Sequence, residues 1–369
     1  MARFFFEGHT YEFVAAARTW QDASTYAQAQ GGHLAVITSA SENNAIIQAA
    51  LADTSLISSA PTANDGGGAK YLWLGATDVV VEGRFAWVTG ESFSLYSAWA
   101  TGPLGREPDD FGGAQDALAM ALEVYPRPSG GIGSAGLWND VNERNTLSFV
   151  IEYDELRGTE ASETIQAGAG ADTVRALAGD DTISGGGGEN YLRGDEGNDS
   201  IVGGTGFDDA NGNMGNDTVS TGAGEDYCVG GKDNDSLSGG ANYDLVYGNL
   251  GDDTCNGDDG DDIVRGGQGN DVVNGGNGID FVSGDKGDDT MTGGAGADVF
   301  HTFGDAGIDR VTDFNLAQGD RVQIDPGTAF RLSQVGADTI ITMTTGGGQM
   351  TLVGIQLSSL THGWVDFGA

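Results

Sequence analysis

Carboxylates recur along the chain at an interval of nine residues, and their type and spacing indicate a series of metal sites. The interval holds without a slip from residue 172 to residue 298. Carboxylate oxygens and the main-chain carbonyls of glycine-rich turns are hard ligands that suit Ca²⁺, and neither thiolate nor imidazole occupies this register. The fifteen candidate ligands are Asp172, Asp181, Asn190, Asp199, Asp208, Asp217, Asp226, Asp235, Asp244, Asp253, Asp262, Asp271, Asp280, Asp289 and Asp298.

The residues around each candidate ligand indicate how it is positioned. An apolar residue stands two positions after each candidate ligand. Glycine stands two positions before each of them except Asp235 and Asp244, which have Asp233 and Asn242 at that position. We expect a glycine-rich turn of six residues followed by a three-residue strand whose central side chain points inward. Eighteen residues then complete one coil of a parallel β-roll, and alternate repeats line opposite faces. Cys228 and Cys255 take inward positions, so we expect buried free thiols on opposite sheets.

The predicted roll cannot be stable through apolar burial alone. Its core is one apolar residue thick per strand, and the chain carries 55 acidic against 16 basic residues, a net charge of -39. Burial on this scale does not offset the ordering entropy of the glycines and the repulsion between stacked carboxylates. We therefore expect on the order of ten Ca²⁺ ions, each bridging turns one coil apart. A disordered Gly/Asp linker is the alternative, and the regular inward apolar residues argue against it.

Residues 160–300 resemble the repeats-in-toxin (RTX) calcium-binding β-roll. The nonapeptide GGQGNDVVN at 266–274 nearly matches the repeat GGxGxDxUx, in which U is apolar. The resemblance implies that a type I secretion apparatus exports the chain unfolded, using an uncleaved C-terminal signal, and that extracellular Ca²⁺ folds it. The N-terminal sequence agrees, because it lacks the features of a cleaved signal peptide. We expect a secreted protein, extracellular or on the cell surface.

The residues that follow the repeats change in character. The stretch DTIITMTTGGGQMTLVGI at 338–355 is typical of a hairpin around a glycine turn. We expect residues 301–369 to form a β cap that covers the last coil and carries the secretion signal.

The first 155 residues have an ordinary globular composition and hold five of the six tryptophans. Thr19 is expected to cap a helix over 20–30, and Ser39 with Glu42 to form a capping box for a helix near 40–51. Short strands are expected near residues 71, 84, 117 and 148. Trp73, Trp87 and Trp99 are expected in the core.

The order of several segments in this region resembles the C-type lectin domain. They are the first helix with Trp20 and Ala23, GGHLAVITSASEN from 31, WLGATD from 73, EGRFAWVTGE from 82, EPDD from 107, WNDV from 138 and FVIEY from 149. The resemblance covers roughly residues 1–155. It places the four usual cysteines of the family at Ala27, Ala117, Glu143 and Ile151, so both disulfides are absent.

The resemblance also implies a calcium and sugar site. Its ligand set in this chain is Glu107, Asp109, Gln115, Asn139 and Asp140, with Pro108 in a cis peptide bond as in the family. Gln115 stands where the family has an acidic residue, so one charge is missing. Paired hydroxyls of a sugar would complete the coordination of Ca²⁺. The triplet EPD combines features of mannose-type EPN and galactose-type QPD sites and does not name the sugar.

Two other function classes remain open at this point. Lectin-like folds also bind proteins or ice, and then they keep Trp138 and the WND segment for structure alone. Calcium repeats also accompany secreted hydrolases, but the chain has no HExxH motif, and its nearest approach to GxSxG has Ile132 in place of glycine. The four histidines, His9, His33, His301 and His362, are scattered in sequence and suggest no metal site or catalytic base.

The sequence thus predicts a mainly β protein with an α+β head. We expect a C-type lectin-like domain over 1–155, an RTX parallel β-roll over 156–300 and a small β cap over 301–369. The expected function is that of a secreted, calcium-dependent lectin or adhesin of bacterial type, without enzymatic activity, that binds a carbohydrate or glycoconjugate. Strong acidity argues against nucleic acid as a partner, and no apolar run is long enough for a membrane span.

Overall fold

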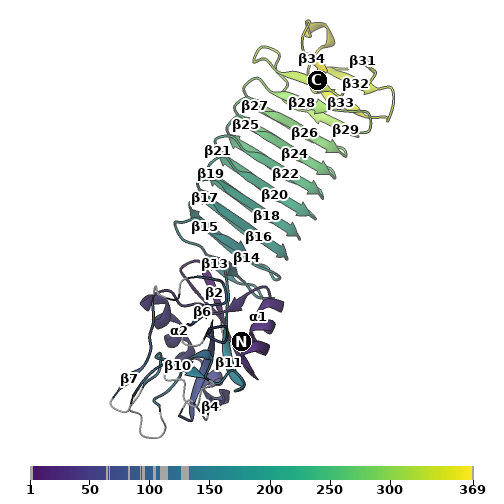
Figure 1. Cartoon of the computed structure of the whole chain (residues 1–369). Coiled ribbons are helices and arrows are strands. Elements are labelled where there is room, and N and C mark those ends of the chain that lie inside the picture. Colours follow the sequence, from purple (N-terminus) through teal and green to yellow (C-terminus); the bar gives the residue numbers. More distant parts are fainter. Residues whose placement is uncertain are drawn as a thin grey trace. The chain divides into compact units, whose positions relative to one another are not determined.

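The computed structural model describes residues 3–63, 65, 67–81, 84–91, 93, 96–102, 105–108, 115–125 and 133–367. The chain divides into two compact units, Met1–Glu155 and Leu156–Ala369 (Figure 1). The predicted mainly β composition with an α+β first unit is confirmed. Every helix among the described residues is too short or too polar to traverse a lipid bilayer.

The first unit, called the head below, is a mixed sheet with helices. Its sheet runs in the order β1-β2-β11-β5-β9-β10, and β3, β4 and β6 pair beside this path. The pair of β11 with β5 is parallel, while β11 pairs antiparallel with β2 and β3. The elements are β1 Arg3–Phe6, β2 His9–Arg18, α1 Trp20–Ala29, β3 His33–Leu34, α2 Ala40–Ala52, α3 Thr54–Ser59, β4 Thr62–Ala63, β5 Ala69–Thr77, β6 Ala86–Trp87, β7 Thr101–Gly102, β8 Gly105–Arg106, β9 Ala117–Ala121, β10 Trp138–Val141 and β11 Leu147–Tyr153.

Both expected helices of the head form, and one detail of their capping differs. The Ser39 side chain accepts a hydrogen bond from the Glu42 main-chain N–H at 3.1 Å, as a helix N-cap does. The predicted reciprocal bond from the Glu42 carboxylate to Ser39 is wrong. Glu42 is buried, and its carboxylate accepts instead from the Thr38 N–H and the Tyr11 hydroxyl, both at 2.8 Å. Burial against β2 therefore redirects this side chain into the head interior.

Aromatic side chains form the core of the head around Trp138 of β10. The rings of Trp87, Tyr96 and Trp99 lie 5.8, 5.5 and 6.0 Å from it, centroid to centroid, in edge-on contacts that suit aromatic quadrupoles. Trp73 and Trp87 are buried and Trp99 is partly buried, which confirms that they belong to the core. This packing fixes β9 and β10, which carry part of the predicted site.

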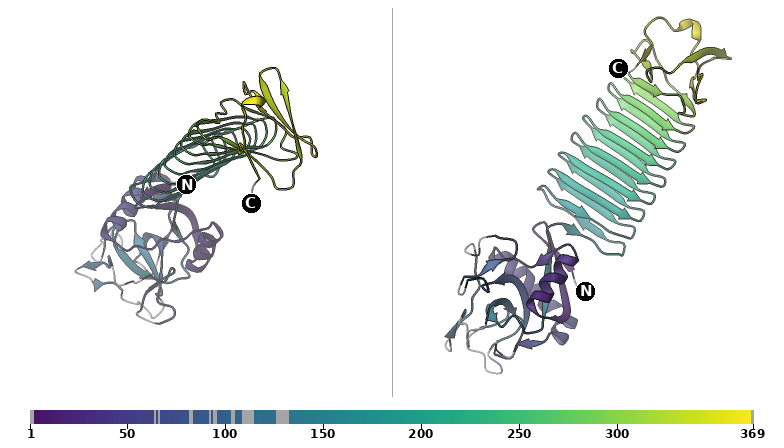
Figure 2. Two further views of the ribbon diagram at one scale, coloured as in Figure 1. Left: turned by 90° about the horizontal axis from the view of Figure 1, so that it is seen from above. Right: turned by 45° about the vertical axis from the view of Figure 1, so that its right-hand side comes forward.

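The second unit winds into a roll of parallel strands. One sheet contains the even-numbered strands in the order β12-β14-β16-β18-β20-β22-β24-β26-β28-β30-β34, and the other contains the odd-numbered strands from β13 to β33 with β31 and β32 at its end. Within the repeats, each paired residue lies opposite the residue eighteen positions later, for example Ile183 opposite Ile201. The predicted coil of eighteen residues is therefore confirmed, and Figure 2 shows the coils side by side.

The strand bounds of the second unit follow the nine-residue period. They are β12 Leu156–Arg157, β13 Thr164–Gln166, β14 Thr173–Arg175, β15 Thr182–Gly187, β16 Asn190–Glu196, β17 Ser200–Thr205, β18 Asp208–Met214, β19 Thr218–Ala223, β20 Tyr227–Lys232, β21 Ser236–Ala241, β22 Leu245–Leu250, β23 Thr254–Asp259, β24 Ile263–Gln268, β25 Val272–Asn277, β26 Phe281–Lys286, β27 Thr290–Ala295, β28 Val299–Thr302, β29 Ile308–Val311, β30 Arg321–Ile324, β31 Phe330–Val335, β32 Asp338–Met343, β33 Gln349–Leu352 and β34 Val365–Phe367, with the 3₁₀-helix η1 at Leu357–Ser359.

Most strands are longer than the predicted three residues. In β15 the pairing covers Thr182–Ser184, skips one residue, and resumes at Gly186 and Gly187. The second stretch belongs to the expected turn, where main chains of adjacent coils lie so close that a Cβ on Gly204 would be 1.9 Å from the Gly186 carbonyl oxygen. Glycine thus lets pairing continue into the turn.

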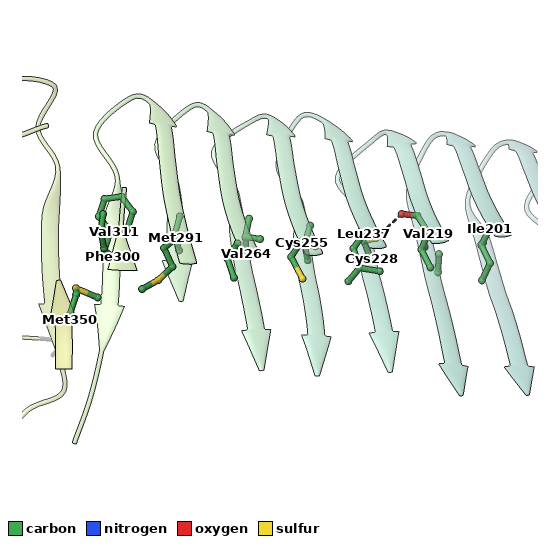
Figure 3. Packing of buried hydrophobic residues seen from close by; sticks show 14 of the residues in the cluster. Ile201, Val219, Cys228, Leu237, Cys255, Val264, Met291, Phe300, Val311 and Met350 are labelled. Atoms are coloured by element: carbon green, nitrogen blue, oxygen red, sulfur yellow. Dashed lines mark hydrogen bonds between the residues drawn. The ribbon is translucent and has the colours of Figure 1, made fainter. Parts of the chain in front are cut away.

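The inward residues form a single column of apolar side chains between the two sheets (Figure 3). All fifteen predicted inward residues are buried, from Val174 to Phe300. Cys228 of β20 and Cys255 of β23 lie in opposite sheets as buried free thiols, as predicted, and burial raises the pKa of both. The Cys228 thiol donates to the Val219 carbonyl at 3.8 Å.

Parallel stacking continues past residue 300. Strand β28 pairs with β30 and β30 with β34, while β27 pairs with β29 and β29 with β33. The expected glycine-turn hairpin is β32 with β33, and β31 adds a further antiparallel strand beside β32. The segment beyond the repeats therefore extends the two sheets of the roll before it adds the hairpin.

Leucine substitutions at inward and outward positions test the direction of the roll's side chains. Leu237 of β21 is 1% exposed in the column, whereas Leu245 of β22 has an outward position and is partly exposed. In Ca²⁺, Leu237→Ala should lower the free energy of unfolding by about 2–5 kcal/mol, and Leu245→Ala by less than about 1 kcal/mol. Chemical denaturation followed by circular dichroism measures both. Equal losses would contradict the inward assignment.

Candidate functional site

Aspartates at the predicted positions form two ladders along the roll, and one carboxylate oxygen of each holds adjacent coils together. The Oδ1 atom accepts the main-chain N–H of the aspartate eighteen residues earlier. Asp217 Oδ1 accepts from the Asp199 N–H, and Asp235 Oδ1 accepts from the Asp217 N–H, both at 2.8 Å. The same bond joins Asp208 with Asp226 on the other side of the roll. Each carboxylate therefore has a fixed orientation before any ion is considered.

The second oxygen, Oδ2, is buried in a setting that suits a cation. It lies beside the glycine five residues earlier and near a main-chain carbonyl of the next coil. A Cβ on Gly203 would be 2.5 Å from both Asp208 Oδ2 and the Thr221 carbonyl oxygen. Buried anionic oxygens without a donor are costly. Among the described residues no hydrogen-bond partner reaches Oδ2 of Asp181, Asp199, Asp208, Asp217, Asp235, Asp244, Asp253, Asp262, Asp271, Asp280 or Asp298.

The pKa values of these carboxyl groups reflect that cost. Burial raises the pKa of Asp262 to about 6, of Asp217 to about 7 and of Asp235 to about 8. Neighbouring carboxylates add to the rise, and the main-chain hydrogen bonds to Oδ1 oppose it. Since burial is the leading cause, the charged form of each carboxylate requires a compensating positive charge.

The ends of the ladders depart from this pattern. Asn190 is neutral, and its amide Nδ2 donates to Asp208 Oδ1 at 2.8 Å. Two further aspartates, which the sequence did not predict as part of the ladders, continue them. Asp309 accepts a hydrogen bond from the Asp289 main-chain N–H at 3.4 Å, and Asp320 accepts one from the Asp298 N–H at 3.2 Å. Their spacing of 20 and 22 residues breaks the period. The signal that could have found them is the apolar residue two positions after each, Val311 and Val322.

Four of the five predicted ligands of the head lie among the described residues, and all four are buried. Glu107 is 7% exposed, Gln115 2%, Asn139 3% and Asp140 1%. Asn139 and Asp140 lie on β10, where they pair with Ala119 and Leu118 of β9. The Glu107–Pro108 peptide bond is cis. Asp109 lies outside the described residues.

Tyr71 of β5 connects these polar groups. Its hydroxyl accepts a hydrogen bond from Asn139 Nδ2 at 2.9 Å. Burial raises the pKa of Tyr71, the bond from Asn139 opposes the rise, and the negative charges of Glu107 and Asp65 add to it. Because the Asn139 amide nitrogen is directed at Tyr71, its carbonyl oxygen is the atom that remains for another ligand.

Asp65 is a second residue that the sequence reasoning missed. Its main-chain carbonyl accepts from Gln115 Nε2 at 3.2 Å. Its carboxylate accepts from the Asn142 N–H at 2.9 Å and from Asn145 Nδ2 at 2.6 Å. It thereby ties the residues after β10 to the loop before β5. No short motif indicates this role, because the partners are 50 to 80 positions away in sequence.

The described part of the predicted head site contains two carboxylates, Glu107 and Asp140, together with the amides of Gln115 and Asn139. Within the part of the chain that the structure describes, one group of His, Cys, Asp or Glu has three ligand atoms within 4.8 Å of one another, and it is His9, Glu152 and Asp154. His33 lies beside it, with Nε2 3.3 Å from Asp154 Oδ1. His9 and His33, which are scattered in sequence, are thus brought together by separate strands.

Comparison with known proteins gives matches to two family models. Residues 16–150 match the lectin C-type domain. Four consecutive copies of the RTX calcium-binding nonapeptide repeat match residues 157–192, 193–228, 229–264 and 265–300. These families are typically non-enzymatic, and both indicate Ca²⁺ binding.

Individual relatives are more distant. The alpha-N-acetylgalactosamine-specific lectin of Patiria pectinifera is 27% identical over 152 residues, which are 40% of this chain and 76% of that lectin. Collectin-11 of Danio rerio is 26% identical over 149 residues, 40% of this chain and 44% of its own length, so the match spans less than half of that protein. A solved carbohydrate-recognition domain of cow CD23 has 24% identity and a TM-score of 0.30, covering 41% of this chain and 92% of that one. The chain thus contains a C-type lectin domain followed by RTX calcium-binding repeats, and it is a calcium-binding, lectin-like protein.

Proposed function

We propose that the protein is a secreted, calcium-dependent carbohydrate-binding lectin or adhesin whose roll is folded by Ca²⁺. The observation that carries the proposal is that Glu107, Asn139 and Asp140 are all buried within a C-type lectin domain, where Asn139 donates to the Tyr71 hydroxyl and the charge of Glu107 acts on the same hydroxyl. Glu107 precedes a cis proline, as the family resemblance leads one to expect.

In the head, Glu107, Asp109, Asn139 and Asp140 would hold Ca²⁺ through oxygen atoms, and Gln115 would contribute its amide carbonyl. Gln115 donates its amide nitrogen to the Asp65 carbonyl, which directs its oxygen away from Asp65. The bound ion would supply a Lewis-acidic centre for vicinal sugar hydroxyls. The carboxylates and the Asn139 amide then bind the same hydroxyls by hydrogen bonds. With one charge fewer than the usual ligand set, the site should bind Ca²⁺ weakly.

In the roll, the buried Oδ2 atoms and the glycine-turn carbonyls are the groups that would hold Ca²⁺. On the order of ten ions fit the repeat number, and Asp309 and Asp320 continue the same hydrogen-bonding role beyond the repeats. Where Ca²⁺ is scarce, the uncompensated carboxylates would keep the segment unfolded. This supports passage through a type I secretion apparatus, followed by folding outside the cell.

A head that recognises a protein or ice surface is the second candidate. Three consecutive valines favour it, because Val79, Val80 and Val81 are 62, 89 and 50% exposed. An apolar surface of this kind is typical of contact with another macromolecule. A glycan array probed with and without chelator separates the two candidates, since only the lectin retains glycans in a Ca²⁺-dependent manner.

Calcium removal and pH together test the roll. The pKa of these carboxyl groups is about 6–8 in the folded roll, above the usual value of 3.8. Each such group therefore stabilises the fold below pH 4, where it is protonated. It loses that contribution as the pH rises through the folded pKa. In chelator, the β signal that the roll contributes to circular dichroism should therefore be absent above pH 8 and partly return near pH 4. Ca²⁺ should restore it at neutral pH, whereas Mg²⁺ should not. A full β signal in chelator at pH 8 would refute calcium-dependent folding.

Substitution of both WND ligands tests the sugar site. Asn139→Ala with Asp140→Ala should reduce Ca²⁺-dependent glycan retention by at least about a hundredfold, because two oxygen ligands are lost. The matched control is Asn234→Ala with Asp235→Ala, the same dipeptide in the roll. The control should retain glycan binding, since the two sites lie in separate units and act independently. Unchanged retention in the head variant would show that the site is elsewhere.

Gln115→Glu tests the effect of the missing charge. The added carboxylate should tighten Ca²⁺ binding about tenfold and shift half-maximal glycan retention to lower Ca²⁺. In chelator the same variant should be less stable, because the carboxylate loses the donor that Gln115 offers to the Asp65 carbonyl. Gln115→Ala, which removes the oxygen ligand, should shift retention in the opposite direction. Identical Ca²⁺ dependence in all three proteins would exclude residue 115 from the site.

A further inference from the structure

We propose that the head contains a separate site for Zn²⁺ or a similar transition-metal ion, formed by His9, Glu152 and Asp154 with His33 as the fourth ligand. These residues lie at the ends of three strands and belong neither to the predicted sugar site nor to the roll. The side-chain atoms that would hold the ion are His9 Nδ1, Glu152 Oε1, Asp154 Oδ1 and His33 Nε2.

Strand pairing explains why residues so far apart in sequence meet. Glu152 of β11 lies opposite Tyr11 of β2 on one side and opposite His33 of β3 on the other. Side chains alternate along a strand, so His9 and Asp154, two positions from Tyr11 and Glu152, share their face. The close approach of β3 requires Gly32, where a Cβ would be 2.5 Å from the Glu152 carbonyl oxygen.

Three of the distances between the ligand atoms lie near those of a tetrahedral metal site. His9 Nδ1 is 3.0 Å from Glu152 Oε1 and 3.6 Å from Asp154 Oδ1, and His33 Nε2 is 3.3 Å from Asp154 Oδ1. Zinc bonds of 2.0–2.2 Å at tetrahedral angles place adjacent ligand atoms about 3.3–3.6 Å apart. His9, Glu152 and Asp154 offer ligand atoms within 4.8 Å of one another, and His33 lies outside that group, so its ring must shift to bind the same ion.

The orientation of His33 supports a cation at its outer nitrogen. Its Nδ1 lies 3.0 Å from the Leu34 carbonyl oxygen, which can only accept a hydrogen bond. In the neutral imidazole the proton is therefore on Nδ1, and Nε2 directs a lone pair toward the Asp154 carboxylate. Metal-bound histidines have this same arrangement, in which the far nitrogen donates to a carbonyl.

Charge in this part of the head also calls for a cation. Glu152 is 4% exposed, and the Tyr11 hydroxyl lies between it and Glu42, another buried carboxylate. Among the described residues no Lys or Arg forms an ion pair with Glu152. The basic side chains within ion-pair distance of its carboxylate are those of His9 and His33. Hydrogen bonding and charge from Glu152 raise the pKa of His9, so a protonated His9 is the competing arrangement. Imidazole ligands favour Zn²⁺ over Ca²⁺, so the calcium of the other sites would not displace it.

Titration of the full chain with ZnCl₂ in saturating Ca²⁺ tests the site. Isothermal calorimetry should detect one tight Zn²⁺ site per chain, and His9→Gln with His33→Gln should weaken it by at least about a hundredfold. The matched control is His301→Gln with His362→Gln. His301 Nε2 contacts one carboxylate, Asp325, at 3.1 Å, so this control should bind Zn²⁺ as the unaltered protein does.

Asp154→Asn is a second test variant, and it should not disturb folding because the Asp154 side chain is 74% exposed. It should weaken Zn²⁺ binding at least about tenfold while the circular dichroism in Ca²⁺ stays unchanged. With Co²⁺ as the probe, the unaltered protein should show the visible absorption bands of a tetrahedral nitrogen and oxygen site, and the histidine variant should not. If the unaltered protein showed no tight Zn²⁺ site, the four residues would not form a metal site. If the His9→Gln with His33→Gln variant bound Zn²⁺ as tightly as the unaltered protein, the ion would lie elsewhere. Either result overturns the proposal.

Discussion

Repulsion between buried, like-charged carboxylates is the constraint on which the second unit depends. Each coil places an aspartate Oδ2 in the interior, and the next coil repeats it about 4.8 Å away. One oxygen of each carboxylate is already used to hold the main chain of its neighbour, so the side chains cannot turn outward without breaking the stack. The single column of apolar side chains offers too little burial to overcome this repulsion. This repulsion is the physical basis for the proposal that cations fold the roll.

The head satisfies its buried and half-buried acids in a different way. Glu42 accepts hydrogen bonds from Thr38 and Tyr11, and Asp65 accepts them from Asn142 and Asn145. Its core has two clusters of aromatic and aliphatic residues, with Trp138 in contact with several rings. Metal ions would there act at particular sites rather than along the whole core. Under the proposed function, the two units use calcium differently, the head for binding and the roll for folding.

Much of the roll could be predicted because its contacts are periodic. The nine-residue interval alone places Asp217, Val219 and the glycine before them, and the structure repeats that arrangement coil after coil. Prediction failed at Asp309 and Asp320, where the period changes. It also failed for the strand length, because the further pairing of glycine main chains in the turns has no signature in the side-chain pattern.

In the head, the sequence by itself determined the capped helices, the core tryptophans and, through family resemblance, the set of residues from Glu107 to Asp140. Only the tertiary structure showed that Tyr71 and Asp65 organise those residues, and that His9 and His33 meet at Glu152 and Asp154. The physical reason is the range of the contacts. A repeat brings together residues whose separation is constant, whereas the strands of the head bring together residues more than a hundred positions apart, and no local pattern encodes which of them become neighbours.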